Sequence, residues 1–446
     1  MFIHPNRRAA VLLFAIDLLA SVVVLNFVAY FRHVISHPIM WPAIAPVLVF
    51  MLALYLVDGY GAEANKLSLD YASLHLIASV SATLVILLGT FVFVPAGFGL
   101  QSSRAALIVS FSIMGVLSLA YRRYLYARAI DSMRGSKIVF IGRQSDFDIF
   151  AAECARLGNQ RTLMHADSGM GYKGVEDILE QVAQGKIHVE AIVLKESESQ
   201  LPSDISIKLM QLYFKSVPTY TLELFHQIYW RKIPLYRINP IWLFQDGFKV
   251  AREPVFERIK RVSDLAFATV GLIVFSPVIL VCALAIKLDD GGPVLFEQTR
   301  IGKQRVPFKL LKLRTMRQDS GKGDPYTRQG DARITRVGRW LRSGRLDELP
   351  QLWNVLCGQM SLIGPRAEWD RLVLEYEVQI PSYNFRHLVK PGITGWAQVN
   401  YRYGSDIQDT LRKLEYDLYY IRNFSFTLDA SIILKTLHVM LFRKGH

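Results

Sequence analysis

Two adjacent carboxylates, Asp347 and Glu348, stand in a stretch of the chain that is otherwise dense in arginine and lysine. Between Glu297 and Arg345 there are fourteen cationic and four acidic residues, so ten positive charges are in excess. Such a surface attracts polyanions, phosphorylated ligands or an anionic bilayer. An acidic pair within it suits Mg2+, and a carboxylate can attack phosphorus as a nucleophile. The plainer alternative is a helix start whose acids complement the helix dipole.

The composition indicates that membrane elements position this pair. The chain has 446 residues, enough for two or three domains. Its apolar share of 51% and mean hydropathy of +0.23 exceed those of a typical soluble protein. A net charge of +14 suits nucleic acid or a membrane surface, and the hydropathy favours the membrane over nucleic acid. The three cysteines show no metal-ligand spacing and no disulfide framework, which fits a reducing cytosol.

Four apolar stretches predict a transmembrane helix bundle over residues 1–130. They run from about 9 to 31, 41 to 57, 71 to 94 and 105 to 121. Basic residues flank the bundle, and by the positive-inside rule they place both of its ends in the cytoplasm. These residues are Arg7, Arg8, Arg122, Arg123 and Arg128. Asp17 and Asn26 lie inside the first stretch, where an interhelical contact is expected rather than a proton relay.

Residues 131–235 have an alternating pattern that predicts a Rossmann-like domain. Strands are predicted over 137–142 and 188–194, helices over 146–157 and 205–214, and an extended segment over 217–222. Dinucleotide binding is not expected, because Gly142 stands alone at the first turn, where the fingerprint needs three spaced glycines. The domain is therefore interpreted as a scaffold or an oligomerisation module, compatible with a homodimer. Residues 236–254 are predicted to be a linker.

A fifth apolar run, Leu265 to Ile286, is long enough to cross a membrane. Basic residues flank it on both sides, which favours two cytoplasmic ends. Pro277 removes a backbone donor near its middle, and the Ser276 hydroxyl can bond the carbonyl that is freed. The residues fit a re-entrant helix over 258–287 with a break at Ser276 and Pro277, and they fit a kinked transmembrane helix equally well.

An ordered series of motifs after residue 255 resembles a known family. The residues that carry the resemblance are Phe296 to Gly302, Lys312 to Met316, Arg345 to Gln351, Gly364 to Arg366 and Lys390 to Gln398. They are similar to those of the bacterial sugar transferases called polyprenyl-phosphate hexose-1-phosphate transferases, or large monotopic phosphoglycosyl transferases. The resemblance covers most of residues 255–446. One departure is Ala367, followed by Glu368, where the family commonly has proline after the Gly-Pro-Arg motif.

The resemblance implies a reaction and a set of roles. A sugar 1-phosphate would pass from a UDP-sugar, with glucose or galactose expected, to undecaprenyl phosphate, releasing UMP and initiating exopolysaccharide, capsule or O-antigen synthesis. Asp347 would be the nucleophile that forms a phosphosugar-aspartyl intermediate, and Glu348 would position Mg2+ or accept a proton from the lipid phosphate. Asp347 and Glu348 would both hold Mg2+. Candidates for binding substrate phosphates are Arg366, Lys312, Arg314 and Arg300.

The resemblance also resolves the fifth apolar run as a helix that dips into one leaflet. The predicted fold is a membrane protein of the α plus α/β class, with a mainly helical catalytic domain over 255–446. It is expected to be a multi-pass protein of the bacterial inner membrane, with the catalytic domain on the cytoplasmic face. Asp324, Asp331 and Asp417 are further carboxylates, for which salt bridges with neighbouring arginines are the expected role.

Two other functions stay open at this point. A membrane-anchored nucleotide-sugar dehydratase or epimerase would need a glycine fingerprint and a Tyr-x-x-x-Lys pair, and we expect neither of these anywhere in the sequence. A non-catalytic scaffold for polysaccharide assembly would bind a sugar nucleotide without turning it over.

Overall fold

The computed structural model describes residues 5–31, 44–61, 66–93, 104–132, 137–157, 162–169, 171–195, 201–215, 217–235, 248, 254–317, 331, 333–380, 382–401 and 406–441. The chain divides into two compact units, Met1–Arg231 and Lys232–His446.

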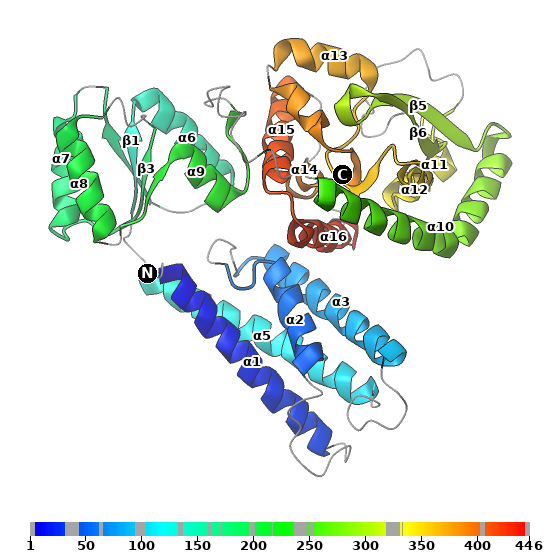
Figure 1. Ribbon diagram of the computed structural model, residues 1–446, viewed down its shortest axis with the longest axis horizontal. Coiled ribbons are helices and arrows are strands. Elements are labelled where there is room, and N and C mark those ends of the chain that lie inside the picture. Colours follow the sequence, from blue (N-terminus) through cyan, green and yellow to red (C-terminus); the bar gives the residue numbers. More distant parts are fainter. Residues whose placement is uncertain are drawn as a thin grey trace. The chain divides into compact units, whose positions relative to one another are not determined.

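The first unit begins with a bundle of four helices. These are α1 (Pro5–Phe31), α2 (Ile44–Leu56), α3 (Leu69–Phe93) and α5 (Arg104–Ser132) (Figure 1). Large apolar side chains such as Leu19, Leu88 and Val116 are well exposed on them. An apolar exterior of this kind suits lipid rather than water as the surrounding solvent. Asp17 and Arg122 are buried within the bundle.

Asp17 and Arg122 form an ion pair between α1 and α5, with Arg122 Nη1 lying 3.0 Å from Asp17 Oδ1. This pair confirms the interhelical contact expected for Asp17. Asn26 instead donates to the carbonyl of Val22, one turn earlier in its own helix. The side chains of Arg7 and Arg8, on which part of the predicted orientation depends, lie outside the described residues.

Within the described residues, four helices are long and apolar enough to cross a membrane: α1, α3, α5 and α10 (Pro254–Asp290). The second predicted span, residues 41 to 57, is not among these four helices. Its helix, α2, has 13 residues, fewer than the roughly 20 that span the hydrocarbon core.

A parallel sheet with strand order β2-β1-β3-β4 completes the first unit. Its strands are β1 (Lys137–Gly142), β2 (Thr162–Asp167), β3 (Val189–Leu194) and β4 (Thr219–Thr221), and its main helices are α6 (Gln144–Arg156), α7 (Lys173–Ala183) and α8 (Ser203–Phe214). Strand β1 is buried on both faces, because Val139 and Ile141 enter one apolar core while Ile138 and Phe140 enter another. The apolar run at β1 therefore predicted a strand of a covered parallel sheet correctly.

A Gly-x-Gly-x-x-Gly spacing does occur in this unit, at Gly169, Gly171 and Gly174, and the prediction from Gly142 missed it. Gly171 has a φ of +99°, which favours glycine at this turn. A side chain at Gly174 would meet no atom within 4 Å, so close helix packing does not require this glycine. The motif also follows β2, an edge strand, rather than a strand at the point where the strand order reverses. It therefore does not reproduce the dinucleotide-binding arrangement.

The second unit is mainly helical, with two small sheets. After α10 come the antiparallel strands β5 (Leu295–Ile301) and β6 (Pro307–Leu313), the parallel pair β7 (Ser361–Ile363) and β8 (Gly392–Thr394), and the helices α11 (Arg336–Ser343), α12 (Gln351–Leu356), α13 (Asp370–Gln379), α14 (Trp396–Asn400), α15 (Ile407–Arg422) and α16 (Phe426–Leu441). Its largest apolar core includes the buried rings of Tyr383, Trp396 and Tyr420. The C-terminal helix α16 joins this core through Ile432, while Leu441 at its end is exposed.

Helix α10 runs for 37 residues without interruption and contains Pro277. Figure 1 shows it changing direction along its length. Ser276 Oγ donates to the carbonyl of Ile273 at 2.8 Å, and this is the carbonyl that Pro277, four residues later, leaves without its helical partner. The serine thereby compensates for the proline, as the sequence predicted. The predicted break at Ser276 and Pro277 is not seen, because the helix continues through both residues.

Candidate active site

The carboxylate pair sits on a tight turn between two helices. Arg345 has a φ of +53°, an uncommon left-handed conformation for a residue other than glycine. A 3-10 turn over Leu346–Glu348 follows, and α12 begins at Gln351. Asp347 is buried, with 8% of its surface exposed. Strained backbone of this kind persists where the surrounding packing fixes it, and it is common at functional sites.

Three cations surround Glu348. Its Oε1 lies 3.1 Å from Lys312 Nζ and 3.5 Å from Arg366 Nη1, and its Oε2 lies 4.0 Å from Arg345 Nη1. Burial raises the pKa of Glu348, but Lys312 and Arg366 outweigh this effect, so that its pKa falls to about 2. Glu348 therefore stays ionised at neutral pH and acts as a counter-charge that holds the cations.

Asp347 has a different environment from its neighbour. Burial raises the pKa of Asp347; Lys312 opposes this rise, and the charge of Glu348 adds to it. In the part of the chain that the structure describes, no hydrogen bond is made to the Asp347 carboxylate. Two adjacent carboxyl groups whose pKa values are moved apart suit separate chemical roles. Asp347 is the carboxylate left available to react.

A hollow of about 220 Å3 is lined by Lys312 and Arg366, the two cations that contact Glu348, and we name it the dyad hollow. Its lining residues are Arg300, Leu310, Lys312, Gln351, Met360, Arg366, Ala367 and Gly392. Three of these are cations, and they come from β5, β6 and the segment after β7. Arginine binds phosphate oxygens in a bidentate manner and lysine binds them as a point charge. The hollow therefore has the charge and the donors that a diphosphate requires.

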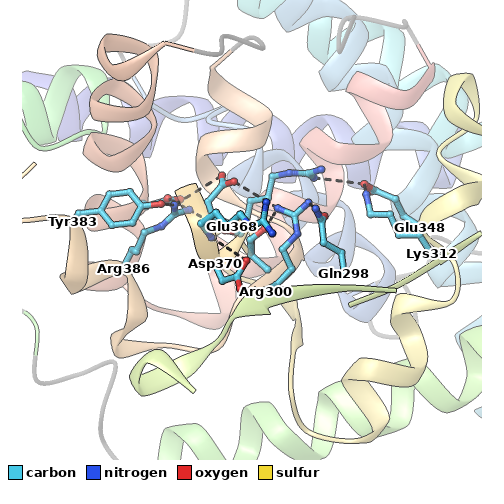
Figure 2. Close-up of polar contacts among 12 residues, drawn as sticks. Gln298, Arg300, Lys312, Glu348, Glu368, Asp370, Tyr383 and Arg386 are labelled. Atoms are coloured by element: carbon cyan, nitrogen blue, oxygen red, sulfur yellow. Dashed lines mark hydrogen bonds and ion pairs between the residues drawn. The ribbon is translucent and has the colours of Figure 1, made fainter. Parts of the chain in front are cut away.

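Two arginines, the buried Arg386 and the partly exposed Arg300, hold the backbone of the segment that carries Arg366. Arg386 Nη2 donates to the Arg366 carbonyl at 2.9 Å, and Arg300 Nη1 donates to the Ala367 carbonyl at 3.1 Å. Glu368 lies 3.7 Å from Arg300 and 3.9 Å from Arg386, so its carboxylate links the two, as Figure 2 shows. The residues that depart from the family pattern, Ala367 and Glu368, thus take part in fixing Arg366.

Two glycine motifs pack backbone against backbone next to the dyad hollow. Gly364 N donates to the Thr394 carbonyl and Gly392 N donates to the Pro365 carbonyl, each at 2.9 Å. A Cβ at Gly392 would lie 2.1 Å from Gly364 N, and one at Gly364 would lie 2.4 Å from the Lys390 carbonyl. Only glycine permits this approach, which explains both motifs and fixes the wall of the hollow.

The other predicted residues lie in different surroundings. The guanidinium of Arg314 packs against Gly292, and Arg314 does not line the dyad hollow. Asp331 accepts bonds from Arg333, which lower its pKa to about 2. Asp417 pairs with Arg386 at 3.0 Å, so both aspartates have the salt-bridge role expected of them. Asp324 lies outside the described residues.

The sequence reasoning missed Arg386 and Arg345 as residues that support the site. Arg386 lies four residues before the motif that begins at Lys390, and it acts on a backbone carbonyl, so the motif itself does not mark it. Arg345 stands two residues before Asp347, and its position at the end of the arginine series was the available signal.

The carboxylate pair supplies part of a ligand set for Mg2+. Among the described residues, no group of three or more His, Cys, Asp or Glu side chains converges as a complete metal site. Mg2+ in phosphoryl-transfer sites commonly takes one or two carboxylates and completes its ligands with water and substrate phosphates. Asp347 and Glu348, adjacent to a hollow suited to phosphates, fit that pattern.

The electrostatics of Asp347 predict a specific pH dependence. Arg342 lowers the pKa of Asp347, although it does not line the dyad hollow. Removing this cation by Arg342→Met is expected to raise the pKa of Asp347, so the acid limb of the kcat/KM profile moves to higher pH. The matched control is Arg339→Met, which removes an exposed arginine from the same helix and should leave the profile in place. An unchanged limb in Arg342→Met would mean that another group limits activity at low pH.

Comparison with known proteins identifies relatives of the chain. The family model described as bacterial sugar transferase matches residues 255–443. A UDP-N-acetylgalactosamine-undecaprenyl-phosphate N-acetylgalactosaminephosphotransferase from Aeromonas hydrophila is 36% identical over 306 residues, which cover 68% of the chain and 70% of the relative. The UDP-glucose:undecaprenyl-phosphate glucose-1-phosphate transferase of Escherichia coli (strain K12) is 45% identical over 183 residues, covering 40% of the chain and 39% of the relative. The exopolysaccharide production protein PSS of Rhizobium leguminosarum bv. phaseoli is 43% identical over 185 residues, which cover 40% of the chain and 92% of the relative.

Proposed function

Because the chain belongs to the bacterial sugar transferase family, we propose that it transfers a sugar 1-phosphate from a UDP-sugar to undecaprenyl phosphate and releases UMP. The product would be the first lipid-linked sugar of an exopolysaccharide, a capsule or an O-antigen. The observation that carries this proposal is the buried Asp347, available for reaction next to a hollow lined by three phosphate-binding cations. Relatives that act on glucose and on N-acetylgalactosamine both occur, so the donor proposed is a UDP-hexose with or without an acetamido group.

The reaction proposed has two displacements at one phosphorus atom. An Asp347 oxygen attacks the sugar-bearing phosphorus of the donor, the bond to the bridging oxygen breaks, and UMP leaves with that oxygen. An oxygen of undecaprenyl phosphate then attacks the same phosphorus and releases the Asp347 carboxylate. An ionised lipid phosphate carries no proton on the attacking oxygen, so the second step needs no strong base.

Glu348 is proposed to organise the cations rather than to accept a proton. A carboxylate whose pKa is about 2 is a weak base. Its bonds to Lys312 and Arg366 hold both side chains at the hollow before the donor arrives. Such preorganisation lowers the cost of binding charged oxygens. Arg300 reaches the same hollow and also supports the Arg366 segment.

Mg2+ is the cofactor proposed, with Asp347 and Glu348 as the residues that would hold it. When bound, it would offset negative charge on the diphosphate. The cations of the dyad hollow would bind the remaining phosphate oxygens.

Helix α10 is proposed to enter and leave the bilayer on the cytoplasmic face of the bacterial inner membrane. Ala268 in its first half packs with Leu352 and Val355, and Ile286 in its second half packs with Leu313 and Leu341. A helix that crossed the bilayer would carry its ends about 30 Å apart on opposite sides. Packing of both halves on one compact unit, together with the change of direction along α10, supports a re-entrant path. This path would hold Asp347 near the level of lipid phosphates.

UMP release tests the proposed activity. Purified full-length protein, undecaprenyl phosphate, Mg2+ and a panel of UDP-sugars are expected to give UMP with at least one UDP-hexose, and EDTA should stop the release. Omitting the lipid acceptor should limit UMP to about one equivalent per enzyme, because the carboxylate is regenerated only in the second step. Sugar-nucleotide binding without UMP from any member of the panel would favour the scaffold function instead.

A further inference from the structure

A second hollow, of about 390 Å3, lies at the beginning of α10, and we name it the α10 hollow. Its lining residues are Glu257, Lys260, Arg261, Asp264, Lys303, Ser361, Ile363, Val389, Lys390, Tyr420 and Phe424. It shares no lining residue with the dyad hollow. Nothing in the proposed reaction uses these residues.

The carboxylates at the α10 hollow are already engaged. Glu257 pairs with Lys303 at 2.5 Å. Asp264 accepts bonds from Ser361 Oγ and from the Leu362 backbone N–H, each at 3.0 Å. Neither carboxylate is therefore a free counter-ion for the remaining cations.

Lys260 is also engaged, because it pairs with Asp429 at 2.5 Å. Two cations then remain, Arg261 and Lys390. Arg261 donates to the carbonyls of Val355 and Leu356 at the end of α12. Its positive charge is thus stabilised by backbone dipoles and not by a carboxylate.

Lys390 has neither a hydrogen bond nor an ion pair with any residue that the structure describes. It is only partly exposed. Burial lowers the pKa of Lys390 and Arg261 lowers it further, whereas the charges of Glu257 and Asp264 raise it by less, so the net shift is downward. Partial burial of an ammonium group without a partner is unfavourable, and an anion would relieve this cost.

Gly358 shows how close the two cations lie. A Cβ built on Gly358 would be 3.3 Å from Arg261 Nη2 and 3.8 Å from Lys390 Nζ. Both groups therefore approach one point at the same glycine. Two cationic groups that converge without a carboxylate between them form a site for an anion.

The surroundings indicate which anion would fit. Val389, Ile363 and Phe424 give the hollow an apolar side. On the first turns of α10, Val255 is 68% exposed and Val262 is 67% exposed, as lipid-facing residues would be. A tetrahedral oxyanion attached to an apolar tail matches this combination of cations and apolar surface.

We propose that the α10 hollow binds a phosphate group between Arg261 and Lys390, separately from the donor phosphates at Asp347. The group is either the phosphate of a membrane lipid or a free phosphate, because both present the same oxygens to the two cations. Occupation by a lipid phosphate would tie the start of α10 to the headgroup layer. The site does not depend on the chemistry of Asp347, so its test uses no measurement of turnover.

Chemical protection of Lys390 tests the proposal on the wild-type chain. Purified, delipidated full-length protein in detergent is treated with an amine-acylating reagent, and modification of each lysine is followed by peptide mass spectrometry. Inorganic phosphate and short-chain phosphatidic acid are added in separate arms, with chloride at equal ionic strength as the control. A ligand at ten times its Kd leaves about one site in eleven free, so acylation of Lys390 should slow roughly tenfold.

The arms distinguish the two sources of phosphate. Protection by phosphatidic acid at a concentration at least tenfold lower than inorganic phosphate would identify a lipid. Equal protection by the two would identify a free phosphate. Lys309, which is 74% exposed on β6, is the internal control and should react at the same rate throughout. No slowing at Lys390 with either probe, or equal slowing with chloride, would overturn the proposal.

Substitutions give a second readout. The rise in Tm caused by short-chain phosphatidic acid should be lost in Lys390→Met and retained in Lys390→Arg, which keeps the charge. Lys309→Met removes the same charge outside the hollow and should retain the full rise. An undiminished rise in Lys390→Met would contradict the assignment of Lys390.

Discussion

An Asp347→Asn variant is expected to lose sugar-phosphate transfer almost completely without losing stability. The amide cannot form the acyl-phosphate bond, so UMP release should fall about 1,000-fold or more. The fold should tolerate the change, because burial raises the pKa of Asp347 and the ionised form is therefore disfavoured in the folded state. At neutral pH the neutral amide removes this cost, and Tm should stay the same or rise. UMP release and thermal unfolding of the same preparation measure both effects.

The matched control is Asp331→Asn, which removes a carboxylate in the same unit. Asp331 is held by Arg333, so its native pKa is lowered to about 2. Its ionised form stabilises the fold above the ordinary aspartate pKa, and this contribution is lost as the pH falls towards 2. The variant should therefore lose some Tm and keep most of the activity. Activity in Asp347→Asn equal to that of this control would remove Asp347 from the mechanism.

We expect that a membrane-impermeant maleimide does not label Cys357 in sealed spheroplasts and does label it after permeabilisation. The thiol is exposed, whereas Cys154 and Cys282 are buried, so native protein has one accessible thiol among the three. Cys357 follows α10 in the chain, and it stays on the cytoplasmic side only if α10 does not cross the bilayer. Mass spectrometry of the peptide that contains Cys357 gives the labelled fraction on each side.

A second probe removes dependence on the local surroundings of Cys357. Lys309→Cys places a thiol on β6, also after α10, at a position that is 74% exposed. Cys282 should react only after denaturation. Labelling of either exposed thiol in sealed spheroplasts would mean that α10 crosses the membrane and that the proposed cytoplasmic site is wrong.

Local sequence signals predicted the parts of the fold that depend on neighbouring residues. Pro277 and the adjacent serine predicted the hydrogen bond from the Ser276 hydroxyl to the Ile273 carbonyl, because proline removes the donor to the residue four positions earlier. The apolar run at β1 predicted a covered parallel strand. Asp347 and Glu348 were predicted as site residues from the resemblance, because their spacing alone favours a helix start.

Features that depend on tertiary contact were not predictable in this way. Arg386 reaches the Arg366 carbonyl from 20 residues away in sequence, and nothing in either segment specifies the other. The different environments of Asp347 and Glu348 arise from Lys312 and Arg366, on other elements.

The most direct test of the account is the mass of the protein after exposure to the donor alone. Full-length protein is incubated with Mg2+ and an accepted UDP-hexose in the absence of lipid acceptor, then quenched and digested. The account predicts that the peptide containing Asp347 gains the mass of one hexose phosphate, that Asp347→Asn gains none, and that undecaprenyl phosphate removes the added mass. Full turnover with the peptide unmodified throughout, or with the hexose phosphate on another residue, would contradict Asp347 as the nucleophile.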